Sequence, residues 1–197
     1  AGSGHDRQGQ RHRDLKNGLT VPPKLTLANV LDVCTKPRWA LGMLGAQGRS
    51  FGNLAGYAPT GRGLSTLSQW IAGQFDPALS WKDVAWVRSL WPGKLIVKGI
   101  LDPEDARLAA AAGADAIVVS NHGGRQLDGA PAAIEALPRI AEAVGGDAEL
   151  WFDSGVRSGQ DVLKALALGA RAVMIGKAFL YGLGAMGHAG VTRALEL

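Results

Sequence analysis

A histidine and an arginine lie three residues apart in a loop that follows a strongly apolar run. The run is DAIVVSN, residues 115–121, and the loop continues as His122-Gly-Gly-Arg125. An imidazole can accept a proton in catalysis, and a guanidinium can hold a carboxylate through two parallel hydrogen bonds. Because two glycines allow a ligand to approach the backbone closely, His122 and Arg125 could serve one pocket for a small acid. A surface turn with two solvated side chains is the alternative.

Two further glycine-containing turns carry groups suited to an anion. Asp153-Ser-Gly155-Val-Arg157-Ser-Gly159 follows one apolar run, and Gly176-Lys177 follows the next. Glycine amides, a helix N-terminus and a cation can together surround a phosphate, and phosphate-binding barrels place this cradle after their last two strands. The pair of turns predicts a phosphate site, with ordinary strand-to-helix turns as the alternative.

Lys98 closes another apolar run, LIVK, just before Gly99. A lysine at the end of a strand can stabilise negative charge that develops on a ring nitrogen of a reduced cofactor. Taken alone, the same lysine could be a charge on the rim of the fold.

The elements that must position these residues alternate from Lys94 onward. Because the strand-like runs are apolar on both faces, they predict a parallel sheet that helices cover on each side. In (βα) barrels the carboxyl ends of the strands carry the chemistry. Strands are expected within residues 94–99, 115–121, 149–155 and 171–177, and helices within 102–114, 130–145, 158–170 and from 178 onward.

Four βα units predict an α/β fold of one of two kinds. An eight-stranded barrel needs about 250 residues, so four units form either an open sheet or half of a barrel. The sequence ends at Leu197 within a helix-like pattern, which favours the C-terminal half of a TIM (β/α)8 barrel, preceded by a helical, loop-rich insertion. The expected organisation is a flexible tail (1–10), the insertion (11–92) and the half barrel with the cofactor and substrate site (93–197).

The insertion predicts short amphipathic helices separated by a loop. Helices are expected at residues 24–34, where Pro37 ends the pattern, and at 64–75 and 80–91, with a glycine-rich loop over residues 44–63.

Composition excludes some classes of protein and leaves others open. The 197 residues are 47% hydrophobic and 19% charged, which suits one globular core, and no apolar stretch approaches the ~18 residues that cross a bilayer. A net charge of +4 favours anionic partners without choosing among them. The single cysteine, Cys34, provides neither an intrachain disulfide nor a zinc-ligand set, and no metal is expected. Nucleic-acid binding is disfavoured because no aromatic-basic recognition motif is present.

Several motifs together resemble one family. They are KGILDPEDAR, AIVVSNHGGRQLDG, DSGVRSGQDVLKALALGA and GKAFLYG, with RHRDLKNG, TKPRWALGML, FGN and FDPALSWKDVAWVR upstream. The chain resembles the FMN-dependent 2-hydroxy acid dehydrogenases and oxidases, which include lactate dehydrogenases, mandelate dehydrogenases and glycolate oxidases. The resemblance covers residues 11–197. The upstream segment is most similar to the bacterial respiratory L-lactate dehydrogenases and next to the mandelate dehydrogenases.

The resemblance implies an enzyme that uses FMN to oxidise a small L-2-hydroxy acid to the 2-oxo acid, with L-lactate as the preferred candidate substrate. A quinone, a cytochrome or another acceptor would then take the electrons. His122 would be the base at the α-carbon or the hydroxyl of the substrate, through a carbanion or a hydride transfer, and Arg125 the partner of the substrate carboxylate. Lys98 would face the N1/O2 edge of the flavin, with Ser120 nearby. The residues implied at the ribityl and phosphate end of FMN are Asp153, Gly155, Arg157, Gly176 and Lys177.

The chain departs from the family pattern in two residues and in extent. The family usually has arginine at the position of Lys177 and a second glycine at that of Ser154. Lysine keeps the charge but not the bidentate fork of arginine. The first half of the family's barrel supplies further flavin contacts, a substrate tyrosine and the aspartate that orients the histidine. We therefore expect this chain alone to be incomplete as an enzyme, and the complete protein to be a homotetramer.

The sequence of residues 11–92 is compatible both with attachment to a membrane and with packing onto the barrel. Five of the six tryptophans lie before the first expected strand, and residues 24–62 carry a net charge of +4. Aromatic, basic amphipathic helices can lie on an anionic membrane surface, but Trp81, Trp86 and Trp91 could equally pack a helix onto the barrel. The expected location is the cytoplasm, with peripheral attachment to the inner face of the cell membrane.

Two other hypotheses for the function compete with that of an FMN-dependent enzyme. One is a half barrel without catalytic activity that docks on membranes. The other is a different phosphate-binding barrel, such as a flavin-dependent isomerase or a nucleotide dehydrogenase. The pairing of His122 with Arg125 argues against the second, because a nucleotide substrate requires no carboxylate clamp.

Overall fold

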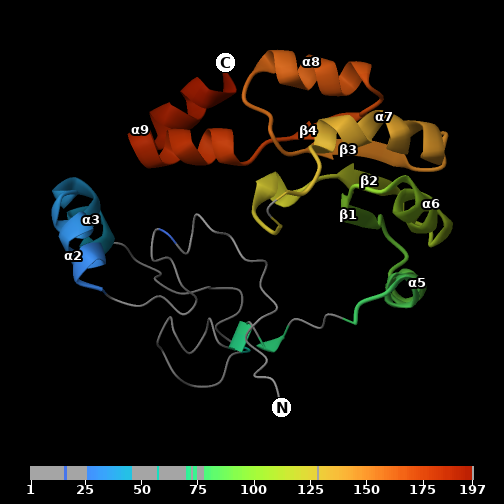
Figure 1. The fold of residues 1–197 in the computed structure, drawn as a ribbon, viewed down its shortest axis with the longest axis horizontal. Helices are drawn as coiled ribbons and strands as arrows, with labels where there is room; N and C mark the ends of the chain where they lie inside the picture. The colour runs from blue at the N-terminus through green and yellow to red at the C-terminus, as the bar shows by residue number, and fades with distance from the viewer. Residues whose placement is uncertain are drawn as a thin grey trace. The chain divides into compact units, whose positions relative to one another are not determined.

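The computed structural model describes residues 78–127 and 129–196, and upstream Lys16, residues 26–45, Tyr57, and residues 70, 71, 73 and 74. The chain divides into two compact units, one within residues 11–78 and one from residue 79 onward. Figure 1 shows the strands and helices of both.

Four parallel strands form one sheet in the order of the sequence. They are β1 (Ile96–Ile100), β2 (Ala116–Val119), β3 (Glu149–Asp153) and β4 (Ala172–Met174). The helices α6 (Pro103–Ala111), α7 (Ala133–Val144) and α8 (Gly159–Ala167) connect successive strands, and α9 (Lys177–Leu195) follows β4. The four predicted βα units are all present.

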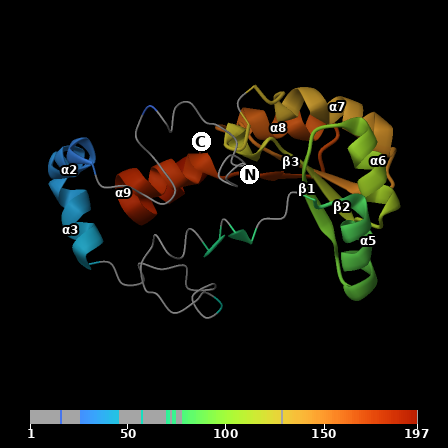
Figure 2. The ribbon, with the colours of Figure 1, turned by 60° about the horizontal axis from the view of Figure 1, so that its bottom comes forward.

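The helices between the strands pack against one side of the sheet (Figures 1 and 2). Ile117, Val119, Leu150 and Phe152 point to that side and join a single buried core with Leu137 and other residues of α7. A doubly wound open sheet reverses its strand order and carries helices on both faces. Sequential order with helices on one side is instead the arrangement of a barrel wall.

Burial of the strands is uneven, which differs from the expectation of a sheet covered on both sides. All four residues of β2 are buried, whereas β1 and β3 alternate between more exposed and more buried residues. The connecting helices cover one face, and on the other face Val118 of β2 is buried, whereas Lys98 and Asp153 of the neighbouring strands are more exposed. Lys98 and Asp153 lie on the opposite face, so their polar side chains stay accessible at the ends of β1 and β3.

Local signals explain where the helices begin. The side chain of Asp102 accepts hydrogen bonds from the amides of Glu104 (2.8 Å) and Asp105 (3.3 Å), and Pro103 occupies the first turn of α6, where its missing N–H costs nothing. Ser158 and Asp161 form a capping box at the start of α8. These caps fix the point at which the chain leaves each strand end and turns into a helix.

The upstream unit contains α2 (Leu27–Cys34) and α3 (Pro37–Gly45). Helix α2 confirms most of the helix expected at 24–34. Helix α3 was not expected, because Pro37 was read only as a stop; at the first position of a helix proline is favourable. Trp70, Ile71 and Gly73 are helical and Gln74 lies in a turn, and the other residues of the expected helix 64–75 and most of the expected loop lie outside the described residues.

Helix α5 (Trp81–Leu90) begins at a capping box between Ser80 and Asp83 and packs against α6 in the same unit as the sheet. Trp81 packs against the buried core, whereas Trp86 and Trp91 are 62% and 55% exposed. The packing role expected for these tryptophans therefore holds for Trp81 alone.

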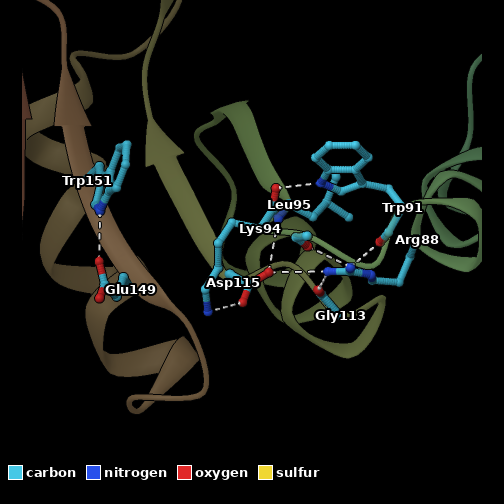
Figure 3. A network of polar contacts seen from close by, with 9 residues as sticks. Arg88, Trp91, Lys94, Leu95, Gly113, Asp115, Glu149 and Trp151 are labelled. Atoms are coloured by element: carbon cyan, nitrogen blue, oxygen red, sulfur yellow. Dashed lines mark hydrogen bonds and ion pairs between the residues drawn. The ribbon is translucent and has the colours of Figure 1, made fainter.

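A polar network ties α5 to the amino ends of β1 and β2 (Figure 3). The guanidinium of Arg88 donates to Asp115 Oδ2 (3.2 Å) and to the carbonyl of Gly93 (2.7 Å). Asp115 also accepts from Lys94 Nζ (2.7 Å) and from the amide of Leu95 (2.9 Å). Because the chemistry of (βα) barrels lies at the opposite end of the strands, this network serves stability.

We expect Asp115→Asn to lower the free energy of unfolding at pH 7, with the loss shrinking in acid. The hydrogen bond from Lys94 and the amide of Leu95 lower the pKa of Asp115 from 3.8 to about 2. A carboxyl whose pKa is lower in the folded protein stabilises it above about pH 4, and this stabilisation disappears as the pH falls towards 2. Urea unfolding at pH 7, 4 and 2.5 would measure the difference.

The matched control is Asp147→Asn, since Asp147 is exposed and its carboxylate accepts no hydrogen bond within the described part of the chain. An Asp115→Asn protein as stable as the wild type at pH 7, or a deficit that persists unchanged at pH 2.5, would contradict the assignment.

Candidate active site

Three side chains from three strands meet at the carboxyl edge of the sheet. Lys98 ends the regular part of β1, Ser120 follows β2, and Asp153 ends β3. Lys98 Nζ donates to Ser120 Oγ (2.9 Å) and forms an ion pair with Asp153, and Ser120 Oγ donates to Asp153 Oδ2 (2.6 Å). The parallel topology thus brings together residues that lie up to 55 positions apart in the sequence.

Ser120 is the buried centre of this cluster. It is fully buried, and its hydroxyl has one proton and two lone pairs. The proton goes to Asp153, and the lone pairs accept hydrogen bonds from Lys98 and from the backbone amide of His122 (3.0 Å). Every buried polar side-chain atom in the described ranges has a partner. A buried network with all its members satisfied holds one geometry.

Opposing influences set the charge of Asp153. Burial raises its pKa, but the hydrogen bonds from Lys98 and Ser120 outweigh this, so the pKa of Asp153 lies below the ordinary value of 3.8. Near neutral pH the group is a carboxylate that only accepts hydrogen bonds. It can hold Lys98 and Ser120 in place, and it cannot act as a proton donor.

The loop after β2 takes an unusual backbone course. His122, Gly123 and Gly124 form the short 3-10 helix η1 (His122–Gly124) with φ values of 57°, 67° and 67°. A left-handed conformation is easy for glycine but costs a histidine on the order of 1 kcal/mol, and such strain persists only where the surroundings enforce it. The two glycines read from the sequence are therefore required by the turn itself.

Side chains from neighbouring turns enforce this course. Each of three successive amides donates to a side-chain oxygen: His122 to Ser120 Oγ (3.0 Å), Gly123 to Ser154 Oγ (2.9 Å) and Gly124 to Asn121 Oδ1 (3.1 Å). The alternative of a free surface turn does not describe this backbone. The imidazole itself is exposed and rests on an anchored loop.

Gly99 makes room for the imidazole. Its φ is +100°, at an irregularity in the pairing of β1 with β2, and a Cβ at this position would lie 2.7 Å from His122 Cε1. Any other residue at position 99 would therefore displace the imidazole. From the sequence, Gly99 was recognised only as the end of a strand, and its place after Lys98 was the available signal.

Arg125 follows η1 with an exposed side chain. Its guanidinium forms no hydrogen bond or ion pair with any residue that the structure describes. Neighbouring Asp128 lies outside the described residues. The guanidinium is therefore free to bind an anionic ligand beside the histidine loop.

The residues expected at the phosphate lie at the ends of β3 and β4. Gly155 has a φ of +82°, and the amide of Arg157 donates to Asp161 Oδ2 (3.0 Å). The guanidinium of Arg157 forms no hydrogen bond or ion pair with any described residue. Gly176 precedes α9, no side chain caps that helix, and nothing lies within 4 Å of a Cβ built on Gly176. Free helix amides and open space suit a phosphate, so the residues present fit FMN.

Lys177 takes a different partner from the one expected. Its ammonium donates to the carbonyl of Gly123, and its Cε lies 3.3 Å from a Cβ built on that glycine. The predicted phosphate cation thus lies against the histidine loop. No feature of the sequence indicated this contact.

Comparison with known proteins identifies the family. A family model described as FMN-dependent dehydrogenase matches residues 5–197. The chain belongs to the FMN-dependent dehydrogenase family. It is 50% identical over 191 residues to an L-lactate dehydrogenase of Xanthomonas campestris pv. campestris (strain 8004), an alignment that covers 96% of this chain and 49% of that protein. An L-lactate dehydrogenase of Xanthomonas euvesicatoria pv. vesicatoria (strain 85-10) is 49% identical over the same coverage.

Solved structures agree with this assignment. The crystal structure of the monotopic membrane protein (S)-mandelate dehydrogenase is similar with a TM-score of 0.86 and 41% identity, covering 96% of this chain and 50% of that one. Mandelate oxidase with (S)-4-hydroxymandelic acid follows with a TM-score of 0.61 and 51% identity over 67% of this chain and 37% of that one. The chain spans about half the length of the curated relatives that it matches.

The family assignment confirms three predictions made from the sequence. The resemblance was correct, the four βα units form half of a TIM barrel, and the cofactor of the family is FMN. Sequence reasoning missed the anchoring roles of Gly99, Asn121 and Ser154. In the sequence, Ser154 departs from the family pattern, but this departure does not indicate its contact with the histidine loop.

Proposed function

We propose that the complete protein uses FMN as cofactor to oxidise a small L-2-hydroxy acid to the 2-oxo acid, and that this acid is L-lactate. The observation that carries the proposal is the cluster of Lys98, Ser120 and Asp153, which fixes the backbone of His122 at the carboxyl edge of a barrel wall. The 50% identity to L-lactate dehydrogenases favours lactate over mandelate and glycolate.

Each residue of the site has a task in this reaction. Arg125 binds the carboxylate of the acid in bidentate fashion, which places the α-carbon and its hydroxyl beside the exposed imidazole. His122 accepts the hydroxyl proton at a ring nitrogen. FMN, when bound, would take up the α-hydrogen together with the two electrons, which leaves the carbonyl of the 2-oxo acid.

Other residues of the chain would hold the cofactor. Lys98 provides positive charge for the N1/O2 edge of the flavin, and Ser120 and Asp153 keep that ammonium in place. The phosphate would bind at the start of α9 and the turn after β3, through Gly155, Arg157 and Gly176. Lys177 would join them only by leaving the carbonyl of Gly123, with which its ammonium pairs in this structure. For the complete protein, the resemblance supports a quinone or cytochrome as electron acceptor and assembly as a homotetramer.

Anaerobic mixing tests the reaction directly. The protein at its natural length, loaded with FMN, is mixed with L-lactate, mandelate or glycolate, and the visible absorbance of the flavin is followed. Rapid bleaching by L-lactate supports the proposal, and bleaching only by mandelate or glycolate selects another member of the family. Absence of bleaching by all three acids overturns it in favour of a different phosphate-binding barrel or a docking fragment without activity.

We also propose peripheral membrane attachment through α2 and α3, at the inner face of the cell membrane. These two helices expose several large apolar side chains, namely Leu27, Leu31, Trp39, Leu41 and Leu44, which are 55–77% exposed. Arg38 of α3 carries a positive charge, as does Lys36 between the helices, which pairs with Asp32 of α2. Such helices can lie in the plane of an anionic bilayer surface. The solved (S)-mandelate dehydrogenase is a monotopic membrane protein. Within the described residues, none of the helices has the length and apolarity needed to span a bilayer.

Co-sedimentation with vesicles of phosphatidylglycerol and phosphatidylcholine tests this attachment. We expect the natural-length protein to bind and a Trp39→Ser, Leu41→Ser double variant to stay in the supernatant. Trp86→Ser, which removes an exposed tryptophan from the other unit, is the matched control. Equal binding by the double variant would refute attachment through these helices.

A further inference from the structure

Ser154 and His122 share a backbone feature. Among the described residues other than glycine, these two have a positive φ, 100° for Ser154 and 57° for His122. They are connected through Gly123, whose amide donates to Ser154 Oγ at 2.9 Å. Conformations that are unfavourable for a side chain persist where surrounding contacts enforce them, and they concentrate at functional sites. Here the contact that joins the two strained residues comes from a hydroxyl group.

Among the described residues, Ser154 Oγ is the acceptor of the Gly123 amide, and the nearest polar side chains are engaged elsewhere. The hydroxyl of Ser120 lies 3.3 Å from Ser154 Oγ, but its proton and both of its lone pairs are already used. Asn121 already accepts from the amide of Gly124. Without the hydroxyl of Ser154, the amide of Gly123 therefore loses its acceptor, and the loop keeps only the anchors on either side.

A glycine at position 154 would adopt the φ of +100° freely but could not accept from Gly123. The serine keeps the hydroxyl at the expense of an unfavourable backbone. This combination is explained if the hydroxyl has a task at the histidine loop.

We propose that Ser154 is a positioning residue for His122. Its hydroxyl fixes the peptide between His122 and Gly123. This sets the direction in which the side chain of His122 leaves the backbone, and so places the imidazole against Gly99. Lys177 holds the carbonyl of the same glycine from the other side. The consequence for catalysis rests on the proposed function, whereas the consequence for the loop does not.

Two substitutions separate the hydroxyl from the backbone strain. Ser154→Ala removes the hydroxyl and keeps a side chain at the positive φ, and Ser154→Gly removes both. Ser89→Ala is the matched control, because the hydroxyl of Ser89 donates only to the carbonyl of Trp86 within α5. All variants are made in the protein at its natural length.

The first measurement is hydrogen–deuterium exchange at the Gly123 amide, without added substrate. We expect faster exchange in both Ser154→Ala and Ser154→Gly, and no change in Ser89→Ala. Wild-type exchange in both Ser154 variants would overturn the proposal whatever the protein catalyses. Faster exchange in Ser154→Gly alone would assign the effect to backbone freedom and would also overturn it.

The second measurement is anaerobic flavin reduction by the acid that bleaches the wild type. We expect the limiting rate constant to fall about tenfold or more in both Ser154 variants, because small displacements of a catalytic group are costly. The KM for the acid and the retention of FMN should change less than about threefold. An unchanged rate constant beside faster exchange would refute the positioning of His122. If no acid bleaches the wild type, the proposed function fails, and the exchange experiment alone decides whether Ser154 anchors the loop.

Discussion

In His122→Ala and His122→Asn we expect flavin reduction by the hydroxy acid to fall by at least about a hundredfold while FMN stays bound. A positioned general base contributes about 10²–10⁴ to a rate, and no other described residue of the loop can accept a proton in its place. Lys98 and Ser120 are joined to each other and to Asp153 without the imidazole, so the cofactor contacts expected of them survive. Asparagine tolerates a positive φ better than alanine and should preserve the loop.

The measurement is stopped-flow absorbance under anaerobic conditions, with the bound flavin quantified before mixing. His188→Ala is the control, since His188 lies in α9 and its removal leaves the loop untouched. Reduction of the His122→Asn protein at the wild-type rate would exclude His122 as the base. Loss of FMN from both variants would place the imidazole among the cofactor contacts instead.

The elements of the half barrel were predictable because their signals are local. Apolar runs separated by helical segments with caps such as Asp102 and Ser158 identify strands and helices wherever the rest of the chain lies. The loop residues of the site were predictable for the same reason, since each follows a strand, and parallel strands place their carboxyl ends together.

What the sequence could not provide depends on contacts between turns. Lys177 was expected at a phosphate, but its ammonium reaches the carbonyl of Gly123, a choice set by the distance between two loops. Ser154 carries no local signal for its bond to Gly123, because a serine after a strand is common and its φ depends on the neighbouring turns. Helix α3 was missed for a different reason: Pro37 stops one helix and begins another, and the pattern alone shows only the stop.

The second large effect is expected at Arg125. Replacing it with lysine keeps the positive charge but removes the planar pair of donors, so the KM for the acid should rise about tenfold, with a smaller effect on the limiting rate of flavin reduction. Arg125→Met removes the charge as well and should raise the KM about a hundredfold or more. Because the guanidinium has no partner among the described residues, neither change breaks an interaction within the described part of the fold.

Steady-state kinetics and the concentration dependence of flavin bleaching measure both effects. Arg107→Lys is the matched control, because Arg107 is an exposed arginine whose guanidinium pairs with Glu104 of its own helix. Unchanged affinity for the acid in Arg125→Met would remove Arg125 from the site. A fall in rate at unchanged KM would assign it to the stabilisation of the reaction itself, since a group that binds the ground state and the transition state equally changes KM without changing the rate constant.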